Sequence, residues 1–255
     1  MSRDATDAVP ARVQLSPLDE ARFGIRSARA ASVTLETLPE IMQFCQANAV
    51  IFLIARCRVE ELATVHAMER AGFRLMDTLL HWSRSLVKGP IPADDCAVPI
   101  RPMRAGEEDS VRRIAVEIFR GYFGHYHADP RLEPQQCDAV YVSWAERSCR
   151  SKAVAEEVLV AELDGRLVGF ITLRRNSAEE GEAVVGGVLP EAQGLGIYRA
   201  FMVRSMEWCK ARGCTRMLVS TQVTNHAVQK VWARLGYEPS DAYYTLHKWF
   251  DEGPG

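Results

Sequence analysis

Two glycines in the stretch Gln193-Gly194-Leu195-Gly196-Ile197-Tyr198 are the first residues whose type and spacing indicate chemistry. A glycine has no Cβ, so the backbone around it can approach a ligand closely. The apolar run 183–189 predicts a buried strand before the loop, and apolar residues at helical spacing predict a helix over 198–212 after it. A strand, a glycine loop and a helix N-terminus together offer free backbone N–H groups to an anion. The loop has no lysine, so backbone dipoles alone would hold that anion.

The sequence excludes one common phosphate loop and disfavours another. No Gly-Lys-Ser/Thr follows the strand, which rules out a Walker-type loop. The third glycine of a dinucleotide fingerprint is missing and the strand lies late in the chain, which disfavours a nicotinamide or flavin site. A simple strand-to-helix turn with two convenient glycines remains the alternative when the loop is considered alone.

A second stretch, 121–132, is aromatic and carries His125, His127 and Asp129. This spacing invites a metal site, but the sequence suggests no further ligands, so we expect no metal. A structural loop between helices is the plainer alternative. In the functional interpretation, His127 or His125 accepts a proton near neutral pH, while Tyr126, Asp129 and Arg131 bind a sugar or nucleotide substrate.

The residues downstream of the glycine loop carry a second pattern. A predicted strand at 217–223 precedes Asn225, which would open a helix, and Leu235-Gly236-Tyr237 follows eleven positions after that Asn (236 − 225 = 11). Together with the Gln-x-x-Gly form of the loop, this order resembles the GCN5-related N-acetyltransferase (GNAT) family. The resemblance is greatest to its tandem members that act on nucleotide-linked amino sugars. It covers 98–250 well and the first half only weakly.

The resemblance implies a mixed-sheet α/β (α+β) GNAT fold, acetyl-CoA or another acyl-CoA as co-substrate, and direct acyl transfer to the amine of a small molecule. The implied coenzyme-binding residues run from the end of the strand to the following helix pair: Val188, Leu189, Gln193, Gly194, Leu195, Gly196, Ile197, Tyr198, Asn225 and Trp232. Backbone N–H groups near Val188 and Leu189 would polarise the thioester carbonyl.

One residue departs from the family pattern. The tyrosine that usually protonates the leaving thiolate lies seven positions after the Asn, and here that position (225 + 7 = 232) is Trp232. An indole N–H donates a hydrogen bond but is not an acid near neutral pH. Either another group such as Tyr198 supplies the proton, or solvent does, or catalysis is weak or lost. Glu182 is a second candidate base after the histidines, and an exposed strand-end carboxylate is its alternative.

Composition narrows the class of protein. The chain has 255 residues, 47% of them hydrophobic, and a net charge of −2 with no basic run, which argues against nucleic acid as a partner. Its seven cysteines form no CxxC pair and predict reduced thiols in a cytoplasmic setting. The polar start predicts no signal peptide, and the apolar runs are too short to predict a membrane span.

The chain predicts a tail at 1–12, an incomplete GNAT-like domain at 13–90 and a catalytic GNAT domain at 96–255. The Pro- and Gly-bearing connector 88–95 separates the domains. The first half resembles the end of the second at an offset of 164, which aligns Gly72 with Gly236 (72 + 164 = 236). At that offset, residues 29–34 align with the glycine loop but contain no glycine. The first half is therefore expected to have the same fold without a coenzyme site.

Three functions remain open. The acceptor is a nucleotide-linked amino sugar, which Arg120, Arg131 and the pair Arg174-Arg175 favour; or it is an amino acid, peptide or polyamine; or, given Trp232, the chain binds acyl-CoA without catalysis. An apolar C-terminal stretch, 243–250, would permit a homodimer.

Overall fold

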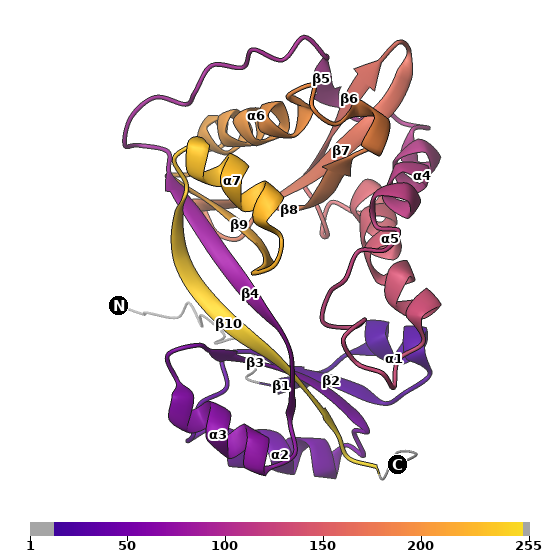
Figure 1. Cartoon of the computed structure of the whole chain (residues 1–255), viewed down its shortest axis with the longest axis vertical. Helices are drawn as coiled ribbons and strands as arrows, with labels where there is room; N and C mark the ends of the chain where they lie inside the picture. The colour runs from indigo at the N-terminus through magenta and orange to yellow at the C-terminus, as the bar shows by residue number, and fades with distance from the viewer. Residues whose placement is uncertain (1–12, 252–255) are drawn as a thin grey trace, which may run out of the picture. The chain divides into compact units, whose positions relative to one another are not determined.

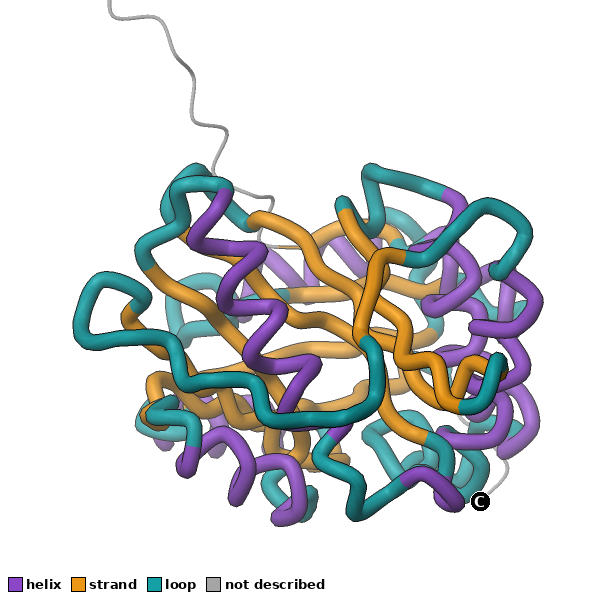
Figure 2. Tube along the Cα trace, turned by 90° about the horizontal axis from the view of Figure 1, so that it is seen from above, coloured by secondary structure: helices purple, strands orange, loops and turns teal. Residues whose placement is uncertain are grey.

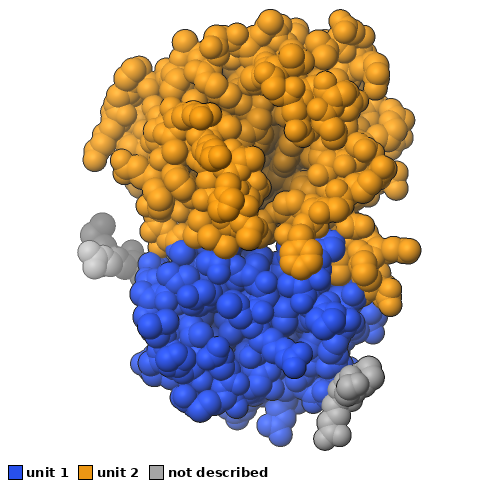
Figure 3. Space-filling model, in the orientation of Figure 1, with its two compact units in different colours: residues 1–79, 124–132, 242–255 blue, residues 80–123, 133–241 orange. Residues whose placement is uncertain are grey.

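The computed structural model describes residues 13–251, so the predicted tail lies outside the described residues. The chain divides into two compact units, which Figure 3 colours separately. Unit 1 comprises residues 1–79, 124–132 and 242–255, and unit 2 comprises residues 80–123 and 133–241.

Helices and strands alternate along much of the chain (Figure 1). In order they are β1 (Val13–Leu15), α1 (Pro17–Phe23), β2 (Ser27–Ala30), α2 (Leu38–Ala47), β3 (Phe52–Arg58), α3 (Leu62–Arg70), β4 (Arg74–Ser85), β5 (Ile100–Pro102), α4 (Glu108–Ile118), α5 (Pro134–Arg150), β6 (Glu157–Leu163), β7 (Arg166–Arg175), β8 (Glu180–Val188), the 3-10 turn η1 (Pro190–Ala192), α6 (Ile197–Ala211), β9 (Arg216–Gln222), α7 (His226–Arg234) and β10 (Glu238–Trp249). The connector 86–99 contains no helix or strand (Figure 2).

Unit 1 is built on the strand order β1-β2-β3-β10. β2 runs parallel to β3, and β10 pairs antiparallel with β3 from the Tyr243–Arg58 pair to the Trp249–Phe52 pair. Helices α2 and α3 bury their apolar faces in one cluster with the strands, because Ile41, Cys45 and Met68 pack there together with Leu53 and Leu246. The C-terminal stretch that suggested a dimer surface is therefore a strand within this unit.

Unit 2 is built on the strand order β4-β9-β8-β7-β6-β5. β8 pairs antiparallel with β7 and parallel with β9, the arrangement of a mixed sheet. The β6–β7 hairpin turns at Asp164 and Gly165, which have φ of 50° and 74°. These are the positive φ values that a two-residue hairpin turn requires and that an Asp-Gly pair adopts readily.

Helices α4 and α6 cover opposite faces of β8. A Cβ added at Gly169, the β7 partner of Val188, would lie 3.1 Å from Phe201 of α6. A Cβ at Gly187 would instead lie 2.9 Å from Ile118 of α4. Since successive residues of a strand face opposite sides, the two helices sandwich this strand.

The internal repeat is confirmed in the bounds of three elements. Adding 164 to β3, α3 and β4 gives 216–222, 226–234 and 238–249, which are the bounds of β9, α7 and β10. Gly72 and Gly236 have φ of 83° and 79° at matching positions. Each repeat thus contributes a strand, a helix, a left-handed glycine and a long strand in the same order.

The compact units do not follow the boundary predicted between residues 90 and 96. Part of the last strand of the second repeat, residues 242–249 of β10, belongs to unit 1, where it pairs with β3. Residues 80–85 of β4, from the first repeat, belong to unit 2, where β4 neighbours β9. Each unit therefore includes part of a strand from the other repeat, which a boundary placed at a connector does not anticipate.

Two helices precede the β6–β7 hairpin. α4 begins at Glu108 with Glu107 at its N-cap position. α5, which has Pro134 at its first position, was not delimited by the sequence. Pro at a helix's first position is a recognised start signal, because its missing N–H would have no partner there.

Candidate acyl-CoA site

The central feature of unit 2 is the parting of β8 from β9. The two strands pair in parallel only from Glu180–Arg216 to Ala183–Val219. β8 continues to Val188 beside β7, but its register with β9 ends at Ala183. A register shift between Ile171 and Leu173 of β7 marks a bulge at the same level. Bulges bend a strand and increase its twist, which accounts for the divergence.

Beyond the bulge, two N–H groups of β8 point into the opening. The Leu189 N–H donates to the Val168 carbonyl at 2.8 Å, so Leu189 belongs to a hydrogen-bonded pair. Along an antiparallel strand, the N–H groups of successive residues point alternately toward the partner strand and away from it. The N–H groups of Gly186 and Val188 therefore point away from β7, toward the side where β9 no longer pairs with β8. The prediction that Leu189 contributes its N–H is therefore wrong. Gly186, which the sequence analysis did not single out, takes that place.

The glycine loop adopts the predicted backbone. Gly194 and Gly196 have φ of 83° and 78°, and a Cβ at either would meet no atom within 4 Å. The loop is therefore open to solvent, and Gly196 is the N-cap residue of α6. The Gln193 side chain folds back to donate to the Val188 carbonyl at 3.4 Å, which ties the loop to the end of β8. No acidic residue occupies the first turn of α6, so its positive end is unopposed.

The connector between the repeats lies against this loop. Arg199, in the first turn of α6, donates to Asp95 at 2.5 Å, and Arg204 donates to Asp94 at 3.0 Å. The Cys96 thiol donates to the Leu195 carbonyl at 3.4 Å. The loop itself contributes only backbone dipoles, because it contains no lysine or arginine. Arg199 adds a side-chain cation close to it, currently engaged by a carboxylate that is itself largely exposed.

Tyr198 and Trp232 form a pair. The buried Trp232 donates its indole N–H to the Tyr198 hydroxyl oxygen at 3.2 Å. Burial raises the pKa of Tyr198 above its ordinary value, the nearby Tyr122 hydroxyl adds to the shift, and the Trp232 hydrogen bond opposes it. Tyr198 therefore keeps its proton, and its hydroxyl oxygen accepts from Trp232, which leaves the phenolic O–H to donate elsewhere.

Asn225 lies at the N-cap of α7 as predicted, but its side chain makes no capping bond. Its amide donates to the Thr221 hydroxyl at 3.0 Å instead. The Asn225 carbonyl accepts from the Gln229 side chain at 3.2 Å. These bonds fix the turn between β9 and α7 rather than leaving the Asn225 amide to face a ligand.

Tyr122 is a site residue that the sequence analysis missed. Its hydroxyl donates to the side-chain oxygen of Gln222, the last residue of β9. Its ring packs edge-on against Phe119 and Tyr141, with centroids 5.6 and 4.9 Å away. The only signal in the sequence is the aromatic run beginning at Gly121, because the partner is 100 residues away.

The predicted substrate loop behaves differently. His125, Tyr126 and Asp129 are all buried in unit 1. Asp129 accepts from His247 at 2.7 Å and from Trp249 at 2.9 Å, and the second ring nitrogen of His247 lies 2.9 Å from Nδ1 of His125. This chain of bonds belongs to the interior of the unit. His125 as a base and Asp129 as a substrate ligand are therefore corrected to structural residues.

The electrostatics of this buried chain are consistent with a neutral His125. Burial alone would raise the pKa of Asp129, but hydrogen bonds from His247 and Trp249 outweigh it and hold that pKa below its ordinary value. With Asp129 ionised, His247 donates to it through Nδ1 and accepts from His125 through Nε2. Burial lowers the pKa of His125 well below its ordinary value, and the neighbouring His247, Arg56, Arg29 and His127 act in the same direction.

Tyr126 is equally committed to unit 1. Its hydroxyl donates to Asp19 at 3.0 Å and accepts from Arg29, while Arg29 also donates to Asp19 at 2.6 Å. Burial raises the pKa of Tyr126 above its ordinary value. A fully buried hydroxyl bonded on both sides cannot contact a substrate, so Tyr126 is also a structural residue.

The remaining predicted residues, His127, Glu182 and Arg131, differ in burial and in hydrogen-bond partners. His127 is half-buried, and its Nδ1 lies 3.4 Å from the Gly124 N–H. Glu182 is buried and accepts from Arg174 at 2.7 Å, so it is neither an exposed strand-end carboxylate nor a free base. Arg131 donates to Asp251 at 2.8 Å and its guanidinium lies 3.8 Å from the Trp249 ring centroid.

Within residues 13–251, no cluster of three His, Cys, Asp or Glu side chains has the arrangement of a metal site. Over the same residues, no helix combines the length and hydrophobicity that crossing a bilayer requires.

Residues 111–237 match the Acetyltransferase (GNAT) family. This stretch belongs to that family, so the chain carries an N-acetyltransferase domain of the GNAT type. A likeness to the GCN5-related N-acetyltransferase from Sphaerobacter thermophilus, with a TM-score of 0.66 over 95% of this chain and 77% of that one at 15% identity, shows the same fold.

Two relatives are similar in sequence. The chain is 25% identical to the dTDP-fucosamine acetyltransferase of Escherichia coli O6:H1 over 250 residues, which cover 94% of this chain and 100% of the relative. It is 27% identical to the mycothiol acetyltransferase of Streptomyces griseus subsp. griseus over 180 residues, which cover 69% of this chain and 55% of the relative. The chain thus spans about half of the second relative and the full length of the first.

Neutral burial of His125 predicts a pH-dependent stability. An unfolded histidine takes up a proton near its ordinary pKa of about 6.5, whereas folded His125 does not. Stability should therefore be fully present above that pH and fall as the pH drops below it, by up to about 1.4 kcal/mol per pH unit. Urea unfolding between pH 7.5 and 5 measures this slope.

His125→Gln should be less stable at pH 7.5 and show a flatter pH dependence. His66→Gln, which changes an exposed histidine of the same unit, serves as the matched control and should keep the wild-type slope. An unchanged slope in His125→Gln would mean that other groups carry the pH dependence.

Proposed function

We propose that this protein transfers an acetyl group from acetyl-CoA to the amine of a small molecule, most specifically a nucleotide-linked amino sugar. The observation that carries the proposal is the pair of N–H groups of Gly186 and Val188 at the parting of β8 and β9, one loop away from the open glycines at the start of α6. A thioester carbonyl and a diphosphate are the two acceptor groups that this backbone suits.

The loop residues would hold the diphosphate. Gly194 and Gly196 leave the amides of the loop and of the first turn of α6 uncovered, and the helix dipole favours a negative charge there. Arg199 lies beside them, and exchanging Asp95 for a phosphate oxygen would give it a stronger partner. The opening between β8 and β9 then receives the pantetheine arm beside the strand N–H groups.

The reaction needs two proton movements. The amine nitrogen attacks the thioester carbon, the C–S bond breaks, nitrogen loses a proton and sulfur gains one. We assign the proton for sulfur to Tyr198, whose hydroxyl is oriented by Trp232 at 3.2 Å and stays protonated. This pair takes over the role of the family's tyrosine, which supports a catalytic protein over a simple acyl-CoA binder.

Tyr122 is proposed to position the amine. Its hydroxyl donates to Gln222, which fixes the ring at the end of β9, where β8 and β9 have diverged. Gln222 ends β9 and Tyr122 ends the segment after α4, so both belong to elements bordering the opening. Glu182 is not proposed as the base, because Arg174 holds it.

The nucleotide-linked acceptor is supported by the full-length similarity to dTDP-fucosamine acetyltransferase. The arginines that first favoured it are all engaged by carboxylates: Arg120 by Glu117, Arg131 by Asp251, Arg174 by Glu182 and Arg175 by Glu156. The acceptor class therefore rests on the relative and not on those arginines.

Gly196→Arg should abolish acetyl-CoA binding. A side chain at this position projects into open space in front of the loop amides and fills the place of the diphosphate. Calorimetry measures the affinity directly. Gly213→Arg is the matched control, because Gly213 has φ of 84° and equally open surroundings at the other end of α6. Both changes carry the same backbone strain, so retained binding in Gly196→Arg would reject the loop assignment.

Tyr198→Phe should lower kcat by about 10- to 100-fold while leaving the affinity for acetyl-CoA nearly unchanged. Trp232→Phe removes only the hydrogen bond that orients Tyr198, so its kcat should fall less. Tyr122→Phe should instead raise the KM of the amine. Tyr244→Phe in unit 1 is the control and should behave as wild type. Equal kcat in Tyr198→Phe and wild type would assign the proton to solvent.

An amine panel tests the acceptor. With acetyl-CoA and release of free thiol as the readout, a nucleotide-linked amino sugar should exceed the unlinked amino sugar, an amino acid and spermidine by at least about tenfold in kcat/KM. A higher kcat/KM for the amino acid or for spermidine would show that the acceptor is not a nucleotide-linked amino sugar. It would not contradict the proposed acyl transfer. Thiol release with no amine in the panel would leave only the binding function.

A further inference from the structure

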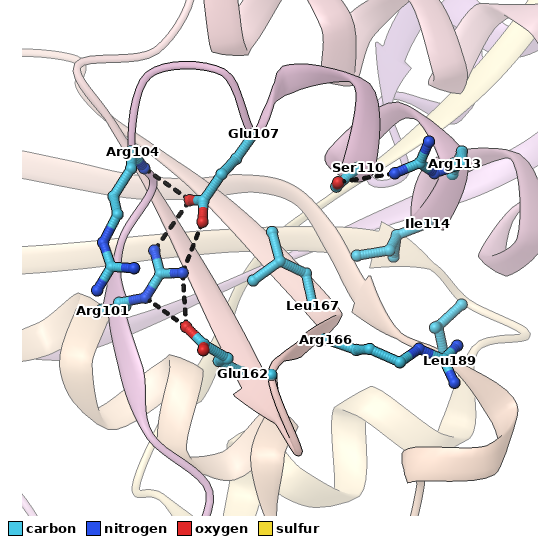
Figure 4. A pocket seen from close by; sticks show the side chains of 11 residues that line it. Arg101, Arg104, Glu107, Ser110, Arg113, Ile114, Glu162, Arg166, Leu167 and Leu189 are labelled. Atoms are coloured by element: carbon cyan, nitrogen blue, oxygen red, sulfur yellow. Dashed lines mark hydrogen bonds and ion pairs between the residues drawn. The ribbon is translucent and has the colours of Figure 1, made fainter.

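A pocket of about 540 Å³ lies in unit 2 on the α4 side of the sheet. It is formed by the β5–α4 segment, the β6–β7 turn and Leu189 after the end of β8 (Figure 4). This volume is in the range of small-molecule sites. Of the residues that the sequence predicted for coenzyme contact or proton transfer, the pocket includes Leu189 alone, and the N–H of Leu189 is bonded to Val168. The pocket is therefore distinct from the proposed acyl-CoA site.

The charges in this pocket do not balance. Its lining carries the four arginines 101, 104, 113 and 166 against the two glutamates 107 and 162, a net charge of +2 (4 − 2). Both glutamates bind the same guanidinium, because Arg101 donates to Glu107 at 2.6 Å and to Glu162 at 2.7 Å. This bonding lowers the pKa of Glu107 to about 2, so the carboxylate stays ionised and keeps Arg101 fixed as part of the wall.

The other three arginines retain binding capacity. Arg104, Arg113 and Arg166 are exposed and come from three different segments: the β5–α4 loop, α4 and the start of β7. Arg113 donates to the Ser110 hydroxyl at 2.9 Å, a neutral partner that leaves its charge uncompensated. In Figure 4, Arg166 extends along the pocket toward Leu189, while Arg104 lies beside the Arg101–Glu107 pair.

The floor between these cations is apolar. Ile114 of α4 and Leu189 are buried, and Leu167 of β7 lies between them and the charged wall. A ligand that fits must therefore carry negative charge on one side and an apolar or ring portion on the other. Guanidinium groups arriving from three directions suit the tetrahedral oxygens of a phosphate better than the single plane of a carboxylate.

We propose that this pocket binds an organic phosphate, a dianionic phosphate ester whose apolar portion rests on Ile114, Leu167 and Leu189. The inference does not depend on the acetyl-transfer proposal, because it uses a different set of residues. Leu189 directly follows Val188, so the occupied pocket would border the end of β8 from the face opposite α6.

Calorimetry with phenyl phosphate and with inorganic phosphate tests the proposal. The full chain carrying Gly196→Glu is the host, since a carboxylate in the glycine loop repels phosphate there and leaves only the pocket to bind. Phenyl phosphate should bind with Kd below about 1 mM and about tenfold more tightly than inorganic phosphate, because its ring covers the apolar floor. Binding should weaken with added salt.

Adding Arg113→Gln and Arg166→Gln to this host should weaken phenyl phosphate binding at least about tenfold. Both side chains are exposed, so folding should be retained, and the thermal unfolding midpoint verifies this. Arg150→Gln, the same change at an exposed arginine of unit 2 outside the pocket, should leave the affinity unchanged. No binding up to about 10 mM, or equal affinity with and without the two arginines, would overturn the proposal. Failure of acetyl-CoA binding elsewhere would leave this result unaffected.

Discussion

The parting of β8 from β9 after the Ala183–Val219 pair is the constraint on which the proposed site depends. Two glycines make it possible. A Cβ at Gly186 would lie 2.3 Å from the Phe170 carbonyl oxygen and one at Gly187 would lie 2.9 Å from Ile118, so side chains at these positions would push β8 away from β7 and α4. Close packing on those two sides keeps β8 paired with β7 as far as Val188 while its other edge is open.

An open strand edge inside a domain has an energetic cost that a ligand can offset. Backbone N–H groups that lose water without gaining a partner cost about 1–3 kcal/mol each, so strands rarely part without a reason. At Gly186 and Val188 the N–H groups face the opening, and a coenzyme with carbonyl and amide groups would supply their acceptors. The same logic applies at the loop, where the amides of α6 have no acidic side chain in the first turn to satisfy them. Fold and binding are thereby coupled through main-chain groups.

The local patterns were readable from the sequence, and the long-range partners were not. Apolar periodicity, the Asp164-Gly165 turn and the offset of 164 placed β3, α3 and their later copies because those signals lie within short windows. The histidine loop was misjudged because its partners, Asp19 and His247, are more than 100 residues away, and only they make its polar atoms interior. Donor directions along β8 depend on pairing with β7, which no residue type encodes.

Both repeats contain the same strand-helix-strand order, but only the second carries the proposed coenzyme loop. At the offset of 164 the glycine loop corresponds to residues 29–34, where Ser32 has φ of 50° and no glycine is present. α2 begins at Leu38, five residues later in the repeat than Ile197 begins α6 (38 + 164 = 202), so the first copy has lost the turn that exposes the amides. What it retains is β4, whose residues 80–85 complete unit 2, while β10 completes unit 1. Without the first copy, unit 2 would lack the strand that neighbours β9, although that copy has no coenzyme loop.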